Sequence, residues 1–168
     1  MLKTNKERYE RTVKLARELA GPKPKGQRWG VLRRKAVYGH TKSSVRKSLI
    51  ATEFCGKRIV VHRKVVKSLH AVQTRIRKAE ETNGWARWTP EVLQCFNWRV
   101  VRGGTSLSRH AHAIALDIDP KDNGMSAHYD KRDKTTIPIR VIKAFEAEGW
   151  TWGGRWDAPC DAMHFERH

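Results

Sequence analysis

The 168-residue chain lacks any apolar run close to the roughly 18 to 20 residues that a membrane-spanning helix needs, so a transmembrane helix is excluded. The N-terminal segment is charged and lacks the apolar stretch of a secretory signal, so we expect synthesis and retention in the cytoplasm unless another factor releases the protein. Cysteine is scarce as well. Cys55, Cys95 and Cys160 are odd in number and far apart, which argues against a disulfide framework or a zinc ribbon and predicts reduced thiols.

Acidic side chains are few, and the deficit lies almost entirely in the first half of the chain. The chain holds 35 Lys and Arg against 17 Asp and Glu, for a net charge of +18. Residues 1–78 hold 23 basic and 4 acidic side chains, whereas residues 79–168 hold 12 and 13. Such an excess attracts polyanions, so nucleic acid, an anionic envelope polymer and a membrane surface are the candidate partners. Apolar residues at 39% with 7 Trp exceed what a disordered chain carries, so the protein should fold.

Periodicity predicts a mixture of separate helices and strands. Apolar residues at helical spacing predict an amphipathic helix over residues 4–20 with a Gly-Pro stop, and a core helix through residues 65–79 that ends at Asn83-Gly84. Another helix is expected over residues 138–148, and residues 21–48 are expected to form loop with short strands. Strands are predicted at residues 58–61, 97–101, 113–119 and 163–166. The expected fold class is therefore α+β, with a single domain.

Side chains suited to metal binding and acid–base chemistry concentrate in two short segments. They are Ser108, His110, His112, Asp117 and Asp119 in the first segment, and Asp161, His164 and Glu166 in the second. In a strand through the first segment, alternation places Asp117 on the face opposite to Leu116 and Ile118. A turn into that strand can bring His110 next to Asp117, and a third ligand from a distant strand leaves a metal's fourth position open.

The spacing of these residues resembles one family of zinc peptidases. His110-x6-Asp117 preceded by Ser108, and Asp161-x2-His164 followed by Phe165-Glu166, are similar to the motifs of D-alanyl-D-alanine carboxypeptidases and phage L-alanyl-D-glutamate endopeptidases, or endolysins. The flanking residues 95–104 and 148–154 look like the same family's flanks, so the resemblance covers roughly residues 58–168. It implies a Hedgehog/D,D-peptidase-like fold with a small antiparallel sheet and flanking helices. The catalytic domain would occupy residues 51–168, and residues 1–50 would form a basic extension of helix and loop.

The resemblance also implies roles for individual residues. Zinc would be bound by His110, Asp117 and His164, with Asp161 as the general base and Arg102 steadying the substrate carbonyl or the developing oxyanion. Physical chemistry agrees, because zinc held by two neutral imidazoles and one carboxylate keeps an open position for water. A carboxylate three residues before a ligand can reach that water, and a permanently charged guanidinium stabilises an oxyanion.

Two further side chains are candidates for substrate contact. The resemblance implies that Ser108 contacts polar groups of the substrate, and a simple turn hydroxyl is the alternative. Among the C-terminal tryptophans, Trp152 is expected to line the cleft, because two glycines follow it and Asp161 is near in sequence. Asp119 is expected to be a turn residue before Pro120, and Cys160 a packed thiol rather than a nucleophile.

Two positions complicate the comparison with this family. Ala113 stands where the family usually has glycine, which constrains the backbone of the local turn. His112 is unexpected, and its role is open among an alternative ligand, a substrate contact and a residue outside the site.

The sequence thus predicts a zinc-dependent peptidase that cleaves the stem peptide of bacterial peptidoglycan, with a phage or prophage L-alanyl-D-glutamate endopeptidase as the favoured reading. The alternatives are a D-alanyl-D-alanine carboxypeptidase, a basic polyanion-binding protein and a metal-dependent nuclease. Nucleic acid is the less favoured partner, because Asp161-x2-His164 fits a peptidase. The basic residues 1–78 would add attraction to teichoic-acid phosphates or lipopolysaccharide. Without a signal peptide, we expect accumulation in the host cytoplasm and holin-type release to the wall, or carriage on the virion.

Overall fold

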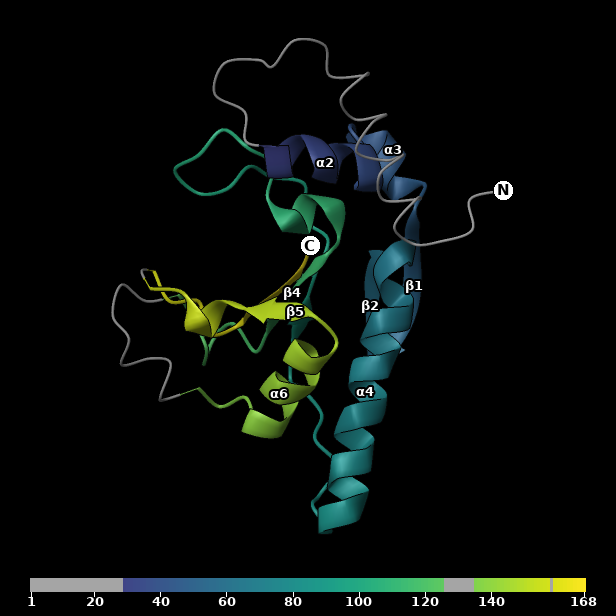
Figure 1. Cartoon of the computed structure of the whole chain (residues 1–168), viewed down its shortest axis with the longest axis vertical. Helices are drawn as coiled ribbons and strands as arrows, with labels where there is room; N and C mark the ends of the chain where they lie inside the picture. The colour runs from purple at the N-terminus through teal and green to yellow at the C-terminus, as the bar shows by residue number, and fades with distance from the viewer. Residues whose placement is uncertain (1–28, 126–134, 158) are drawn as a thin grey trace.

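The structure combines helices with small antiparallel sheets (Figure 1). In this computed structural model, residues 29–125, 135–157 and 159–168 are described. The helices are α2 Trp29–Tyr38, α3 Lys42–Arg46, α4 Arg63–Asn83 and α6 Ile139–Ala147, with the 3-10 turns η1 Arg109–His112 and η2 Gly153–Arg155. The strands are β1 Leu49–Phe54, β2 Lys57–His62, β3 Leu93–Gln94, β4 Ala115–Ile118, β5 Trp150–Trp152 and β6 His164–Arg167. This mixture confirms the predicted α+β class.

The helix α4 follows the β1–β2 hairpin and contributes one side of the core. Its buried side chains recur at the predicted helical spacing, at Val65, Leu69, Val72 and Ile76. Nδ1 of His62 accepts a hydrogen bond from Lys64 N at the start of the helix. Gly84 follows the last turn at φ +66°, a left-handed conformation that glycine adopts without steric cost. The predicted core helix and its glycine stop are confirmed.

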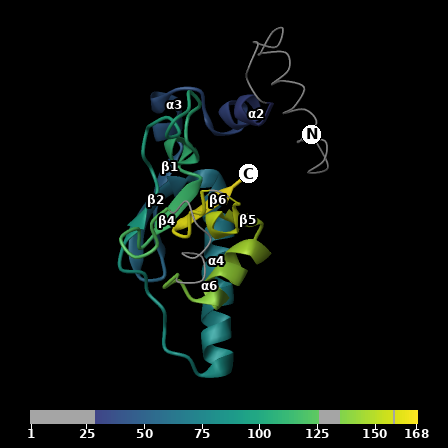
Figure 2. The ribbon, with the colours of Figure 1, turned by 90° about the vertical axis from the view of Figure 1, so that its left-hand side faces the viewer.

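Four short strands build the sheet that carries the candidate site. Their order is β3-β4-β6-β5, and each neighbouring pair is antiparallel. The central register places Asp117 of β4 opposite His164 of β6, and Ala115 opposite Glu166. Cross-strand partners share a face of the sheet, so Asp117 and His164 project to the same side and the small Ala115 leaves room beside Glu166. Figure 2 brings these strands to the front.

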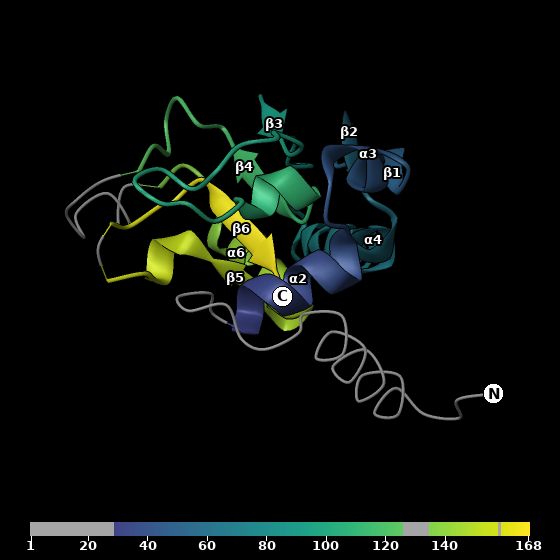
Figure 3. The same ribbon diagram turned by 90° about the horizontal axis from the view of Figure 1, so that it is seen from above.

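Aromatic side chains fill the core behind the other face of this sheet. Phe165, between two site residues in β6, has its ring 4.3 Å from that of Phe145 in α6. The Phe145 ring in turn lies 5.5 Å from Phe54 of the hairpin. Full burial of such a side chain stabilises the fold by about 1.5 to 3 kcal/mol. The helix α6 therefore supports the sheet from behind, and Figure 3 shows the hairpin and α4 to one side of it.

Two predictions of local structure were wrong. Where it is described, the segment expected to be loop with short strands forms α2 and α3. Its many cations hide any apolar periodicity, although Thr41 and Ser44 form a capping box at the start of α3. The strand expected at residues 97–101 is a loop with a single bridge between Val100 and Leu107. Asn97 N donates to His110 O instead of joining a ladder.

The first half of the described chain is joined closely to the rest. Val45 of α3 is fully buried, and Ser48 O accepts a hydrogen bond from Arg63 N at the start of α4. The expected boundary at residue 50 falls within β1. The helix expected over residues 4–20 lies outside the described residues. Among the described helices, none is both long enough and apolar enough to cross a membrane.

Candidate metal centre and cleft

Three candidate ligands from three elements converge in one buried cluster. The turn η1 carries His110, β4 carries Asp117 and β6 carries His164. His110 Nε2 lies 3.2 Å from Asp117 Oδ1, and His164 Nδ1 lies 2.9 Å from the same oxygen. The two ring nitrogens are 3.2 Å apart. The structure thus brings together the three residues that the sequence predicted as metal ligands.

The outer nitrogen of each imidazole faces an acceptor. His110 Nδ1 lies 2.7 Å from Cys95 O, and His164 Nε2 lies 3.2 Å from Glu166 Oε2. Carbonyl and carboxylate oxygens accept hydrogen bonds, so neutral rings carry their protons on these outer nitrogens. The inner nitrogens then present lone pairs toward the Asp117 carboxylate. Three acceptors pointing at one place repel one another, and a cation between them removes the conflict.

The spacing of the three acceptor atoms fits zinc. Zinc bonds of about 2.0 to 2.1 Å to nitrogen and oxygen in a tetrahedron place neighbouring ligand atoms about 3.3 Å apart. The three separations here are 2.9, 3.2 and 3.2 Å, so a small outward movement makes room for the ion. Two imidazoles and one carboxylate are a donor set typical of zinc and leave a fourth position open.

A proton on His164 relieves the same conflict between acceptors. Burial opposes the charged form of His164, but the hydrogen bonds and charges of Asp117 and Glu166 outweigh it and raise the pKa of His164 to about 9. Burial likewise opposes ionisation of Asp117, and the hydrogen bonds from His110 and His164 outweigh it, holding the pKa of Asp117 well below its usual range. Metal binding therefore has to displace a proton from His164.

Glu166 links the cluster to the half-buried Arg109. Its Oε2 lies 3.1 Å from Arg109 Nε, and its Oε1 lies 3.4 Å from His168 Nε2. Burial would raise the pKa of Glu166, but the hydrogen bond with His164 and the charge of Arg109 lower it. An ionised Glu166 fixes the orientation of the His164 ring. Sequence reasoning gave Glu166 no role of its own. Glu166 nevertheless follows His164 by two residues in a strand, and side chains at that spacing project from the same face.

Asp161 lies beside the cluster, and one of its carboxylate oxygens accepts no hydrogen bond from the described residues. Its side chain is buried, and its Oδ1 has no hydrogen-bond partner among the described residues. Burial raises the pKa of Asp161, and the nearby His164 and Arg102 offset this only in part. A carboxylate in this position is suited to take up a proton and pass it on.

The segment that carries Asp161 is held by a close backbone contact with η2. Asp161 N donates to Gly153 O at 3.0 Å, and His164 N donates to Asp161 O at 3.2 Å. A Cβ at residue 153 would lie 2.6 Å from Asp161 O and 3.2 Å from His164 Cβ. Only glycine therefore fits at this position without displacing Asp161 and His164 together.

A cleft of about 980 Å³ opens over the cluster. The three ligands and Asp161 line its floor, and Arg102 and Ser108 line it from the loop before η1. The walls are largely apolar, at Phe96, Val101, Met125, Trp156 and Met163. A cleft of this size and character is typical of sites that bury a small ligand or a short peptide.

The residues predicted to contact substrate are placed differently from one another. Ser108 lines the cleft, and its Oγ also accepts a hydrogen bond from His110 N at 3.3 Å, which caps η1. Arg102 is exposed at the cleft, and Arg99, which sequence reasoning missed, lines it too. The basic and apolar mixture of residues 99–102 gave no signal to separate the two arginines.

The structure corrects the prediction that Trp152 lines the cleft. Trp152 is buried in the core, with its ring 6.4 Å from that of Phe165 and its Nε1 donating to Ala162 O. The reason is strand parity, because β5 pairs with β6 so that Trp152 and Phe165 are cross-strand neighbours on the core face. Trp156, after η2, lines the cleft instead, and its ring lies 5.3 Å from that of His164.

The structure also places the two positions that complicate the comparison with this family. Ala113 adopts φ +53°, the left-handed conformation for which glycine is the ordinary choice. His112 is fully buried, does not line the cleft, and both its ring nitrogens lack a hydrogen-bond partner among the described residues. Burial, with nearby cations such as Arg34, lowers the pKa of His112 to about 4. Asp119 is a turn residue as predicted, with Oδ1 accepting from Val92 N.

Cys55, Cys95 and Cys160 form no disulfide, and all three are buried, in agreement with the expected reduced thiols. Cys160 Sγ lies 3.6 Å from Gly154 O, so it is packed behind the Asp161 segment. Burial raises the pKa of Cys55 to about 12 and that of Cys95 further still, so neither ionises as a nucleophile at neutral pH.

Part of the chain matches one family model. Residues 102–167 match the family model described as D-alanyl-D-alanine carboxypeptidase. The matched range contains Arg102, Ser108, Asp161 and the three candidate ligands. This match confirms the family resemblance expected from the sequence. No curated protein and no solved structure matches the chain.

Proposed function

We propose, from the family match over residues 102–167, that this chain is a zinc-dependent peptidase that acts on the peptide part of bacterial peptidoglycan. The observation that carries the proposal is the convergence of three acceptor atoms from His110, Asp117 and His164 beside a buried carboxylate oxygen of Asp161 without a partner among the described residues. A Hedgehog/D,D-peptidase-like fold is part of the same proposal, supported by the small antiparallel sheet with helices behind it.

Each side chain in the cleft has a defined task in this proposal. Bound zinc would supply a Lewis acid at the open fourth position and lower the pKa of a water there. Asp161 takes the proton from the attacking water and hands it to the leaving amine. Arg102, permanently charged and exposed to the cleft, stabilises the negative charge that develops on the carbonyl oxygen. Ser108, which lines the cleft, contacts polar groups of the substrate in this proposal.

Within this class, we propose cleavage between L-alanine and D-glutamate of the stem peptide. The description of the matched family favours a D-alanyl-D-alanine carboxypeptidase as the second candidate. The size of the cleft supports the endopeptidase, because about 980 Å³ holds more of a peptide than a terminal dipeptide. Either substrate lies in the wall, so we further propose that the protein reaches it by holin-type release or as part of a virion.

The test is incubation of zinc-loaded protein with purified peptidoglycan, followed by mass analysis of the released fragments. New carboxyl ends at L-alanine would identify the endopeptidase, and free D-alanine the carboxypeptidase. Asp161→Asn should lower turnover by about 100- to 10,000-fold without loss of zinc. Asp157→Asn, an exposed carboxylate in the same segment, is the matched control and should act as the wild type. Intact walls after incubation with protein that holds one zinc would contradict the proposal.

A further inference from the structure

One surface of the molecule carries an excess of cations that the cleft does not use. Glu53 is the single acidic residue between Glu18 and Glu80. Residues 42–78 contain 11 Lys and Arg against that one carboxylate. This stretch forms α3, the β1–β2 hairpin and most of α4. The charge asymmetry of the sequence is therefore a property of particular described elements.

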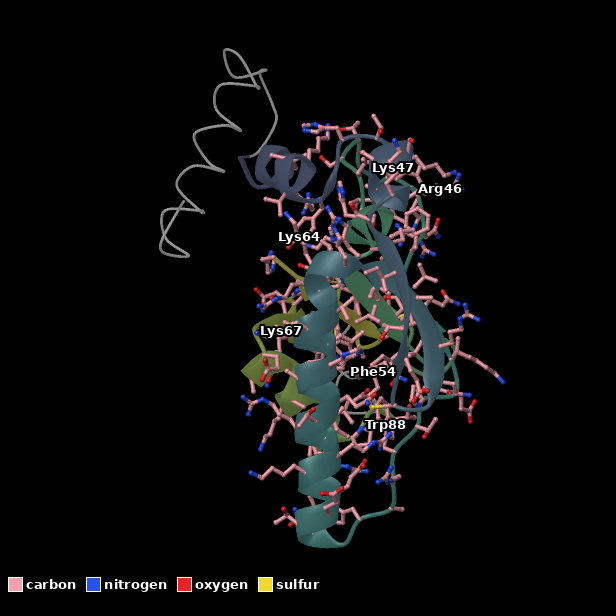
Figure 4. All side chains as sticks on the ribbon, turned by 90° about the vertical axis from the view of Figure 1, so that its right-hand side faces the viewer. Arg46, Lys47, Phe54, Lys64, Lys67 and Trp88 are labelled. Atoms are coloured by element: carbon pink, nitrogen blue, oxygen red, sulfur yellow. The ribbon has the colours of Figure 1, made fainter. Side chains whose placement is uncertain are left out.

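The fold gathers cations from α3 and α4 at one place. Arg63 N donates to Ser48 O at 2.8 Å, which ties the end of α3 to the start of α4. Lys64 Nζ donates to Val37 O at 2.9 Å, which brings the end of α2 to the same point. We call the resulting surface the cationic face and define it by six exposed residues, Lys42, Arg46, Lys47, Arg63, Lys64 and Lys67. Figure 4 shows four of them labelled on this side of the molecule.

The charges of the cationic face destabilise the folded protein. α4 has no acidic side chain in its first turn, although Arg63 and Lys64 stand there, at the end where the helix dipole disfavours cations. Among the described residues, no carboxylate lies within ion-pair distance of Arg46, Lys47 or Lys67. Repulsion between such groups costs free energy in the free protein, and a bound anion would recover it.

The cationic face and the strands of the candidate site lie on different sides of the molecule (Figures 2 and 4). Figures 2 and 4 view opposite sides of the molecule. The strands with Asp117 and His164 lie to the front in Figure 2, whereas α3 and α4 face the viewer in Figure 4. A polymer on the cationic face therefore leaves the cleft open to a second chain.

We propose that the cationic face binds a phosphate-bearing polymer of the bacterial cell wall and so holds the cleft beside its substrate. The choice of polymer rests on the proposed peptidase function, whereas the polyanion chemistry rests on the charges alone. Single cations from α3 and α4, spread over a surface, suit repeating negative charges better than one compact anion. Tyr38, whose ring lies 5.9 Å from Lys64 Nζ, is half-buried and packs edge-on against His62, so it is a poor platform for a nucleic-acid base, and single-stranded nucleic acid is the weaker fit.

The test compares two triple variants of the full chain with equal charge change. Arg46, Lys47 and Lys67 are each replaced by Glu in the first. In the control, Lys78, Arg87 and Lys143, which are exposed elsewhere, are each replaced by Glu. Binding is measured by co-sedimentation with Gram-positive walls over a salt series, using intact walls and walls stripped of phosphodiester polymer by acid. Turnover of a soluble muropeptide is measured on the same variants.

We expect the first variant to bind intact walls at least 10-fold more weakly than the control, and the slope of log affinity against log salt to fall by about two to three. Stripped walls should bind both variants equally weakly. Equal binding by the two variants, or undiminished binding to stripped walls, would overturn the proposal, as would duplex DNA binding 10-fold tighter per phosphate than the wall polymer. Wall binding without muropeptide turnover would instead refute the peptidase function and leave the polyanion surface in place.

Discussion

The carboxylate of Glu166 holds the outer nitrogen of His164 and is itself held by Arg109. We predict that Glu166→Gln lowers zinc affinity by about 10- to 100-fold, because the amide is a weaker acceptor and leaves the Arg109 charge unbalanced. Competition with a chromophoric chelator measures this directly. Glu148→Gln, which removes the partner of Arg75 on the surface, should bind zinc as the wild type does. Equal affinities for the two variants would show that Glu166 does not position the ligand.

Gly153 is the residue whose missing side chain matters most to the site. We predict that Gly153→Ala lowers peptidase turnover by about 100-fold, because the new Cβ displaces Asp161 from the position that proton transfer requires. The free energy of unfolding should fall by about 1 to 3 kcal/mol as well. Gly104→Ala is the control, since a Cβ there would make only ordinary contacts. Full activity of Gly153→Ala would mean that the segment tolerates displacement.

The residues of the candidate site were predictable from the sequence where their spacing along the chain determines how they meet in the fold. His110, Asp117 and His164 converge because a turn enters β4 and because β4 and β6 pair in a register that opposes two ligands. Trp152 was misplaced because its direction depends on the pairing of β5, a strand too short to show alternation. The partner of His164 was missed because the two-residue spacing puts Glu166 on the same face as His164 without showing that their side chains meet.

Among the elements, α4 uses a buried carboxylate to hold the chain that follows it. Glu80 Oε1 accepts from Trp88 N and Oε2 accepts from Arg77 Nη1, each at 2.8 Å. We predict that Glu80→Ala lowers the free energy of unfolding by about 2 kcal/mol, because two partly buried donors lose their buried acceptor. Chemical denaturation measures the change. Glu81→Ala, at the exposed neighbouring position, should change stability by less than about 0.5 kcal/mol.

Elements with a strong local period were predictable, and those defined by pairing were not. The stripe of α4 and the apolar face of α6 each carry their own signal. By contrast, β3 has two residues and β5 three, and each exists only because a neighbouring strand supplies its hydrogen bonds. The helices α2 and α3 were missed because the ten residues of α2 show no clear apolar stripe, and the five residues of α3 are too few to display a period.

The whole molecule should be sensitive to acid. Burial, reinforced by Lys64 and Arg63, lowers the pKa of His62 from 6.5 to about 4. Between pH 6.5 and about 4, His62 is protonated in the unfolded chain but not in the folded chain. The contribution of His62 to stability is therefore complete above pH 6.5 and is lost as the pH falls toward 4. We predict that His62→Asn, which keeps a helix-capping acceptor, loses about 2 kcal/mol less than wild type over this range. Chemical denaturation at each pH measures the free energy of unfolding of both proteins. Equal losses in the two would show that the acid sensitivity arises from other groups.

The account as a whole depends on a metal ion held by His110, Asp117 and His164, and the metal content of purified variants tests this most directly. Two variants are compared after zinc loading and removal of excess metal. His110→Ala removes a ligand, and His112→Ala removes the buried neighbour that does not line the cleft. Circular dichroism confirms that each is folded. We predict one zinc per chain in the wild type and in His112→Ala, and zinc loss from His110→Ala. One retained zinc in His110→Ala, or its loss from folded His112→Ala, would contradict the account.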